Sequence, residues 1–225
     1  IFPVIALMIS LIAYPHLPDQ IPIHFDYNGY PNDYSGKAFV LIIPIIMAGL
    51  LVLADYLPAA DPKSENYAKF PKAYQLLHIL VETLLLVCHI ATIAYPLLEM
   101  NGSLWGVTFV DGSFNFGLIV GPMVGFALML IGNYMPTCKQ SATVGIKIKW
   151  TLENADNWRA THRFSGKVWF ICGLLMIPCA FLPEKFAPVL LISIIFPVVL
   201  LPVCYSYLYY KKQVKEGTYS TENSV

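Results

Sequence analysis

Long apolar segments alternate with shorter polar connections along nearly the whole chain. The apolar segments cover residues 1–14, 38–57, 73–98, 115–135, 168–183 and 187–210. A helix needs about 20 mostly apolar residues to cross the hydrocarbon core of a bilayer. The pattern therefore predicts an all-α polytopic membrane protein, a bundle of six transmembrane helices. The connections suggest a small extracellular cap and a cytoplasmic amphipathic segment in addition.

The Lys and Arg residues in the connections predict how this bundle is oriented. We number the five connections between the apolar segments as loops one to five, in chain order. Loops two and four and the C-terminal tail hold 12 of the 14 Lys and Arg residues, whereas loops one and five hold one each. Cytoplasmic loops carry the excess of Lys and Arg in membrane proteins. We therefore expect both termini and loops two and four in the cytoplasm, and loops one, three and five outside the cell membrane.

This topology divides the chain into four parts. Residues 1–57 form an N-terminal membrane hairpin around an extracellular loop at 15–37, and residues 58–135 contain spans three and four. Residues 136–167 form a cytoplasmic loop, and residues 168–225 contain spans five and six and a cytoplasmic tail. The chain begins at Ile1 inside an apolar run and without Met, so we expect further residues before it.

Composition agrees with a membrane protein. The chain is 57% hydrophobic and 12% charged, against about 25% charged residues in soluble domains. The net charge is zero, which gives no reason to expect nucleic acid as a partner. Four of the five Cys residues lie in expected spans and none lies outside, so we predict buried thiols and no disulfide framework.

Glycine recurs every four residues in the fourth span, at Gly117, Gly121 and Gly125. Small residues at this spacing let two helix backbones approach closely. The pattern is explained either by a contact with another helix of the same chain or by the seam of a homodimer.

Loop one has the pattern of a small folded cap. The strand-like stretch 21–27 ends at Asn28-Gly29, a pair that favours a tight turn because both residues tolerate positive φ. The aromatic and acidic side chains suit packing at the interface or contact with a peptide. A metal site at His16, His24, Asp19 and Asp26 lacks tight zinc spacing, so we predict no metal and no cofactor. The candidate cap or toxin-binding residues are His24, Phe25, Asp26, Gly29, Tyr30 and Lys37.

Loop four combines cations with tryptophans. Thr151 is a candidate N-cap for a helix that runs through Trp158 and His162 and bends at Gly166. Tryptophans beside cations suit a helix at the level of the lipid headgroups. The loop is either a basic hairpin that fixes the topology or a cytoplasmic docking surface. The candidate docking residues are Asn133, Gly145, Lys147, Trp150, Trp158, Arg159, His162 and Arg163.

Span three carries ionisable residues on one helical face. At 3.6 residues per turn, His78, Glu82 and His89 lie on the same side of the helix. Ionisable groups within a span usually face the bundle interior or a wet cavity. A hydrogen-bonded structural cluster, a peptide or ion pocket, a proton-sensitive switch and a metal site all fit the pattern. We expect Glu82 to have a partner, either His78, His89 or a group on another span.

Two motifs resemble the SdpI family of bacterial membrane proteins. The first is Pro-xx-Ile-Pro-Ile-His-Phe-Asp-xx-Gly at 18–29, with Lys37 before the second span. The second comprises Gly-Asn-Tyr-Met-Pro at 132–136, Gly-Ile-Lys-xx-Trp-Thr-Leu at 145–152 and Trp-xx-Thr-His-Arg-xx-Gly-Lys at 158–167. The chain departs from the family at 147–149, where Lys-Ile-Lys stands in place of Arg-Thr-Pro.

The resemblance implies an immunity protein that protects a bacterium against a secreted antimicrobial peptide toxin, and not an enzyme. It also implies a second partner, a small cytoplasmic transcriptional repressor recruited to the membrane. From the residues alone, a small transporter or membrane receptor using the span-three face is an alternative. A metal-dependent membrane enzyme is another.

Overall fold

The computed structural model describes residues 1–26, 31–101, 103–104, 107–108, 117–179, 181–182 and 186–219. It is mostly helical. Its α-helices are α1 (Phe2–Ala13), α2 (Ile42–Ala60), α3 (Pro71–Asn101), α4 (Gly117–Tyr134), α5 (Lys149–Glu153), α6 (Ala155–Cys179) and α7 (Ala187–Lys215). Its strands are β1 (Gln20–Phe25), β2 (Pro31–Gly36), β3 (Ser103–Leu104) and β4 (Val107–Thr108). Short 3₁₀ helices are η1 (Tyr14–His16), η2 (Lys37–Leu41), η3 (Ser64–Lys69) and η5 (Met135–Thr137).

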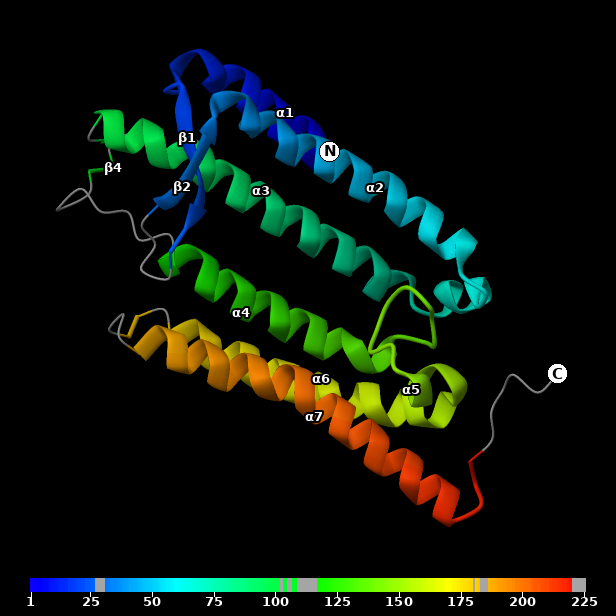
Figure 1. Cartoon of the computed structure of the whole chain (residues 1–225). Helices are drawn as coiled ribbons and strands as arrows, with labels where there is room; N and C mark the ends of the chain where they lie inside the picture. The colour runs from blue at the N-terminus through cyan, green and yellow to red at the C-terminus, as the bar shows by residue number, and fades with distance from the viewer. Residues whose placement is uncertain are drawn as a thin grey trace.

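The long helices run side by side, and loops one and four lie at opposite ends of them (Figure 1). Helix α3 lies between the pair α1 and α2 on one side and α4 on the other, and α6 packs against both α4 and α7. The antiparallel hairpin β1–β2 stands at one end, and η3, loop four and α5 stand at the other. This separation is what two loops on opposite faces of a membrane require.

Several helices have the length and surface of membrane spans. Three helical segments of the described chain are long and apolar enough to cross a bilayer: Lys37–Ala60, Pro71–Met100 and Ile192–Lys215. Large apolar side chains point outward on them, with Val52 70% and Phe196 62% exposed. Soluble monomers rarely expose such continuous apolar surface. Helix α1 with η1 is also apolar but is shorter than these three segments.

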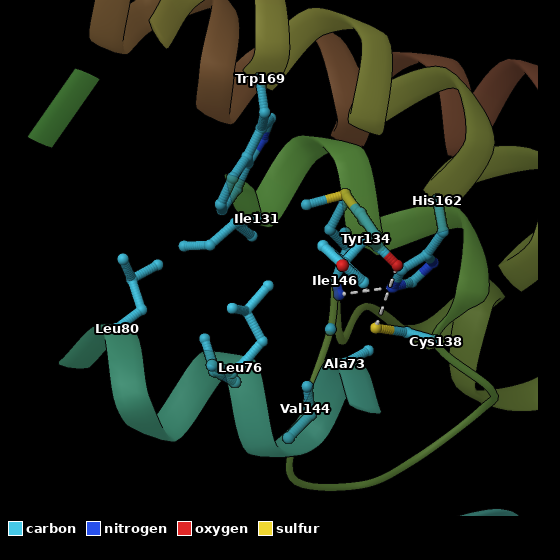
Figure 2. Close-up of a pocket in the computed structure, with 13 residues that line it drawn as sticks. Ala73, Leu76, Leu80, Ile131, Tyr134, Cys138, Val144, Ile146, His162 and Trp169 are labelled. Carbon is cyan, nitrogen blue, oxygen red and sulfur yellow. Dashed lines mark hydrogen bonds between the residues drawn. The ribbon is translucent and has the colours of Figure 1, made fainter. Parts of the chain in front are cut away.

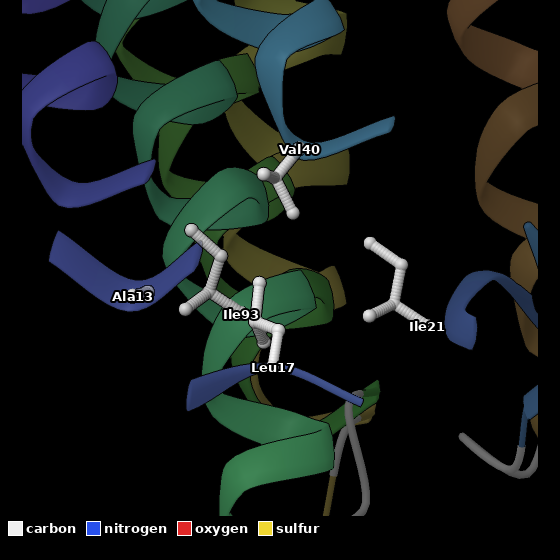
Figure 3. Packing of buried hydrophobic residues seen from close by; sticks show 5 residues of the cluster. All are labelled: Ala13, Leu17, Ile21, Val40 and Ile93. Atoms are coloured by element: carbon white, nitrogen blue, oxygen red, sulfur yellow. The ribbon is translucent and has the colours of Figure 1, made fainter. Parts of the chain in front are cut away.

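The hairpin is joined to the helices through a small apolar core (Figure 3). Ile21 of β1 is fully buried, and it belongs to a cluster that links α1, η2 and α3. The cluster consists of Ala13, Leu17, Ile21, Val40 and Ile93. The predicted strand before the turn is therefore present, and it pairs with β2, which the sequence pattern did not indicate.

Helices α4 and α6 touch backbone to backbone at glycine positions. A Cβ added at Gly125 would lie 2.8 Å from the Gly173 carbonyl oxygen, and one added at Gly132 would lie 2.6 Å from the Gly166 carbonyl oxygen. Gly125, one of the three regularly spaced glycines, therefore makes a contact within the chain. That observation favours the first of the two explanations for the glycine repeat.

Gly132→Ala should lower the stability of the protein by about 1–3 kcal/mol, because the new methyl group must push two backbones apart. Thermal unfolding of the purified protein in detergent measures the effect. The matched control is Gly49→Ala in α2, where an added Cβ meets nothing within 4 Å. The control should be neutral or stabilising by about 0.5–1 kcal/mol. Equal effects of the two substitutions would show that the α4–α6 contact is not tight.

Candidate functional site

The end of the bundle that carries loop four is held by a buried carboxylate. Asp61, at the end of α2, is 4% exposed and accepts hydrogen bonds from the Ala142 N–H at 2.8 Å and the Ser141 hydroxyl at 2.9 Å. The Tyr67 hydroxyl of η3 donates to the same carboxylate at 2.7 Å, and the Lys63 N–H donates to its other oxygen at 2.8 Å. This group connects loop two with loop four, 80 residues apart in the sequence.

These hydrogen bonds stabilise the ionised form of Asp61. Burial opposes ionisation and is the largest single influence on its pKa. The donors from Lys63, Tyr67, Ser141 and Ala142 together outweigh burial and lower the pKa of Asp61 below its ordinary value. Asp61 is thus a charged hydrogen-bond acceptor at neutral pH and not a proton donor.

Gln140 forms a second connection between the same loops. Its carbonyl oxygen accepts a hydrogen bond from the Asn66 side chain at 2.9 Å, and its side-chain oxygen accepts one from the Lys63 ammonium group. Its side-chain nitrogen donates to the carbonyl oxygens of Thr151 and Leu152, each at 2.8 Å. We call the residues Asp61, Lys63, Asn66, Tyr67, Gln140 and Ser141 the loop junction. No local sequence motif connects residues so far apart, so the sequence pattern does not predict this group.

Trp158 and His162 form the interior of loop four and not its surface. Each is 1% exposed, and their rings stack with centroids 4.0 Å apart. The Trp158 indole N–H donates to the Cys138 carbonyl oxygen at 3.0 Å. Gly145 lies against both rings with φ of 119°, and a Cβ there would lie 2.5 Å from His162 Nε2. Only glycine fits this position, which explains one residue of the second motif.

Both ring nitrogens of His162 form hydrogen bonds within loop four. Nε2 accepts a hydrogen bond from the Ile146 N–H at 3.0 Å, and Nδ1 lies 2.9 Å from the Trp158 carbonyl oxygen, to which it donates. A ring with one accepting and one donating nitrogen is neutral. Burial lowers the pKa of His162 to about 4, against the opposing effect of the Trp158 hydrogen bond. His162 therefore has neither a lone pair for a metal nor a surface for a partner.

The helix expected from Thr151 through His162 is two helices in the structure. Ile148 is the N-cap of α5, and Thr151 lies in its first turn, where its hydroxyl accepts a hydrogen bond from the Ile148 N–H at 3.1 Å. Asn154 leaves helical geometry and then caps α6, accepting from the Asn157 N–H at 2.8 Å. The prediction that Thr151 is the N-cap is therefore wrong. Helix α6 continues through Gly166 to Cys179.

Asn157 fixes α6 on α7 through buried polar contacts. Its side-chain nitrogen donates to the Ser206 carbonyl oxygen at 3.0 Å, and its side-chain oxygen accepts from the Ser206 hydroxyl at 2.7 Å and the Thr161 hydroxyl at 2.9 Å. Trp150 of α5 also packs on α7, with its ring centroid 5.1 Å from that of Tyr207. Loop four is therefore a folded unit that is attached to α7.

Of the candidate docking residues, four remain well exposed as side chains: Asn133, Lys147, Arg159 and Arg163. Arg159 forms an ion pair with Asp156. Trp150 is half-buried, Gly145 fits against the buried rings, and Trp158 and His162 lie inside. The exposed part of this face is accordingly polar and basic.

An apolar cavity of about 230 Å³ lies between α3, α4 and loop four (Figure 2). Leu76 and Leu80 of α3, Ile131 of α4 and Trp169 of α6 line it, and the polar edge of His162 lies at one side. The nearby thiol of Cys138 is half-buried, and burial raises its pKa to about 11. The thiol is therefore un-ionised and unreactive at neutral pH.

At the opposite end, the hairpin and the start of η2 carry several of the candidate cap residues. His24 Nδ1 lies 2.5 Å from the Asn32 side-chain oxygen, and the Phe25 ring packs edge-on against Tyr95 of α3 at 5.3 Å between centroids. Lys37 forms an ion pair with Asp19 at 3.1 Å. Gly29 and Tyr30 lie outside the described residues.

The polar face of α3 is buried, but its three ionisable residues do not bond to one another. His89 Nε2 lies 2.9 Å from the Ser10 hydroxyl and 3.1 Å from the Ala6 carbonyl oxygen, so it attaches α3 to α1. Glu82 Oε2, His78 Nε2 and His89 Nδ1 are buried without hydrogen-bond partners among the described residues. The hydrogen bond expected for Glu82 is thus missing at Oε2. No group of three potential metal ligands lies together in the described part of the chain.

The exposed apolar helices indicate a membrane protein, and two regions of its sequence match models of known protein families. Residues 137–206 match the model of the SdpI/YfhL protein family, and residues 1–48 match the Domain of unknown function (DUF1648). The predicted resemblance to the SdpI family is confirmed. The chain is 26% identical over 208 residues to the Immunity protein SdpI of Bacillus subtilis (strain 168), covering 92% of both chains. No solved structure matches the chain.

Asp61→Ala should destabilise the protein by about 2–4 kcal/mol, because it leaves buried donors from loop four without their charged acceptor. Thermal unfolding in detergent measures the loss. Asp55→Ala is the matched control, since Asp55 is an exposed carboxylate of the same helix. If both variants unfold at the same temperature, the loop junction does not contribute to stability.

His162 should make stability depend on pH between about 6.5 and 4. The unfolded chain takes up this proton near 6.5 and the folded chain only near 4, so the contribution is complete above 6.5 and is lost as the pH falls. The unfolding temperature of the wild type should therefore drop more steeply across this window than that of His162→Gln. His16→Gln, at an exposed position, controls for the loss of one imidazole. Equal slopes for wild type and His162→Gln would contradict the assignment.

Proposed function

We propose that this chain is an immunity protein that protects a bacterial cell against a secreted antimicrobial peptide by binding it at the outer membrane face. In this proposal the protein crosses the cell membrane six times with both termini inside, and it acts by binding the peptide and not by turnover. The observation that carries the proposal is the similarity to an immunity protein over 92% of both chains. The similarity includes both ends of the sequence and is not confined to one pair of helices, which supports a shared mechanism.

The chemistry of the hairpin supports a cationic or amphipathic peptide as the ligand. Asp19 and Asp33 are exposed there, and Tyr34 is 48% exposed beside them. Lys37, the cation of loop one, is already paired with Asp19. Exposed acidic and aromatic groups on this hairpin complement a peptide that carries cations and apolar side chains. The β1–β2 hairpin also presents the outer edges of its two strands.

The proposal for the inner face is recruitment of a small cytoplasmic repressor. Loop four, the loop junction and α7 form one connected structure, so a shift of α4 or α6 favoured by a peptide bound outside would move it as a unit. The exposed cations Lys147 and Arg159 suit an acidic surface on the repressor. The buried residues Trp158 and His162 shape this surface from within.

A small transporter or receptor is the alternative function. It is motivated by the unpartnered polar atoms of His78, Glu82 and His89 on α3. Toxin challenge separates the two functions, because protection without transport favours immunity and uptake of a solute favours the alternative.

His24→Ala/Asp26→Ala should weaken protection by about tenfold or more, since these residues belong to the proposed contact surface. The measurement is the minimal inhibitory concentration of each of a panel of secreted peptides for a sensitive bacterium that expresses the chain. Glu65→Ala, at an exposed position on the opposite end, should protect like the wild type. Full protection by a normally expressed double variant would remove the hairpin from the mechanism.

The orientation is tested in the same cells after replacing the five native cysteines. Asn28→Cys should react with a membrane-impermeant thiol reagent in intact cells, and Glu65→Cys should react only after permeabilisation. Labelling of Glu65→Cys in intact cells would overturn the proposed orientation.

Lys147→Gln/Arg159→Gln should reduce toxin-dependent recruitment of the repressor while leaving direct protection near the wild-type level. Recruitment is measured by co-purification of cytoplasmic protein with the membrane fraction before and after toxin addition. Lys69→Gln/Lys72→Gln, an equal change of charge in loop two and at the start of α3, should recruit normally. Undiminished recruitment by the first variant would exclude this part of loop four as the dock.

A further inference from the structure

A groove of about 460 Å³ lies between α4 and α6 near loop four. Its floor is the close contact of Gly132 with Gly166, where neither helix has a side chain to fill the space. Asn133 and Pro136 border it on one side, and Arg163, Lys167, Phe170 and Ile171 border it on the other. Polar and apolar walls therefore meet in one depression.

The two cations at this groove have no partner in the described structure. Neither Arg163 nor Lys167 forms an ion pair or a hydrogen bond with any described residue. Arg159, one turn earlier on α6, is by contrast paired with Asp156. Residues four apart on a helix lie on the same face, so Arg163 and Lys167 present two unneutralised charges side by side.

The apolar wall continues away from these cations along α6. Phe170, Ile171, Leu174 and Leu175 are 39%, 55%, 51% and 55% exposed. Ile171 is one turn beyond Lys167, about 6 Å along the axis, and two turns beyond Arg163, about 12 Å. A few ångströms also separate the phosphate of a phospholipid from the start of its acyl chains, since the headgroup layer is about 5–8 Å thick.

From this arrangement we infer that the groove is a binding site for one anionic phospholipid. The headgroup phosphate lies between Arg163 and Lys167 and accepts a hydrogen bond from the Asn133 amide. One acyl chain lies over Gly132 and Gly166 and against Phe170 and Ile171. A soluble anion would use only the cations, and a zwitterionic lipid would bring its own positive charge close to Arg163 and Lys167 and neutralise them less completely.

The lipid would also fill the open side of the contact between α4 and α6. The glycine contact brings α4 and α6 together without side chains, so the groove beside it lacks the dispersion contacts that a filled interface provides. An acyl chain supplies these contacts from outside. Bound lipid therefore stabilises the folded state in proportion to its affinity.

Native mass spectrometry of the detergent-purified protein tests the inference, with phosphatidylglycerol and phosphatidylcholine as probes. The wild type should retain one phosphatidylglycerol in preference to phosphatidylcholine. Arg163→Gln/Lys167→Gln should weaken that binding on the order of thirtyfold, as expected for the loss of two cations at a membrane surface. The charge-conserving variant Arg163→Lys/Lys167→Arg should keep the preference, which shows that a loss is not caused by misfolding.

Two controls define the outcomes that would overturn the inference. Lys69→Gln/Lys72→Gln removes two exposed cations elsewhere and should bind like the wild type, whereas an equal loss would mean general electrostatic attraction. Inorganic phosphate at millimolar concentration should not displace the lipid, and complete displacement would mean an anion site only. Unchanged phosphatidylglycerol binding by Arg163→Gln/Lys167→Gln would place the lipid elsewhere.

Discussion

The carboxylate of Asp61 is the interaction on which the rest of the structure depends. Helices α1, α2 and α3 pack together with the hairpin, and α4, α6 and α7 pack together on the other side of α3. Besides the packing of α3 on α4, these two groups are joined by hydrogen bonds from loop four to Asp61 and its neighbours in loop two. A charged acceptor in a buried position holds its donors strongly and tolerates few alternative arrangements. The relative position of the two groups of helices is therefore set at one end of the molecule.

The consequence for function is that the two ends of the bundle are mechanically different. The hairpin end is attached through a small apolar cluster around Ile21, and apolar contacts permit sliding because they have no directional preference. The end that carries loop four is attached through directional hydrogen bonds and the stacked pair Trp158 and His162. An adaptable hairpin end and a rigid loop-four end suit a protein whose proposed ligand is a flexible peptide and whose proposed second partner is a folded protein.

Sequence reasoning predicts the parts of this molecule that follow from local pattern. Apolar runs predict the helices, α2 and α3 among them, and the stretch 21–27 predicts β1, because burial and strand geometry impose short-range periodicity. The interior of loop four was not predictable in the same way. Its cations and tryptophans suggested a surface, but Trp158 and His162 turn inward because Gly145 leaves space against their rings. The hydrogen bond between Ser141 and Asp61 crosses 80 residues and leaves no local trace. The buried face of α3 was predicted, whereas its partners depend on which helix packs opposite.

The packing of loop four divides its residues into those that cannot vary and those that can. Gly145, Thr151, Trp158 and His162 are each determined by atoms of the loop itself, so a change at any of them disturbs the whole unit. Lys147 and Lys149 point outward from the same segment, and this is the stretch at which the chain departs from the family motif. Substitutions at these outward positions can therefore change which proposed partner binds, with no loss of fold along the way. The outward positions of loop four can change because its buried residues hold the fold without them.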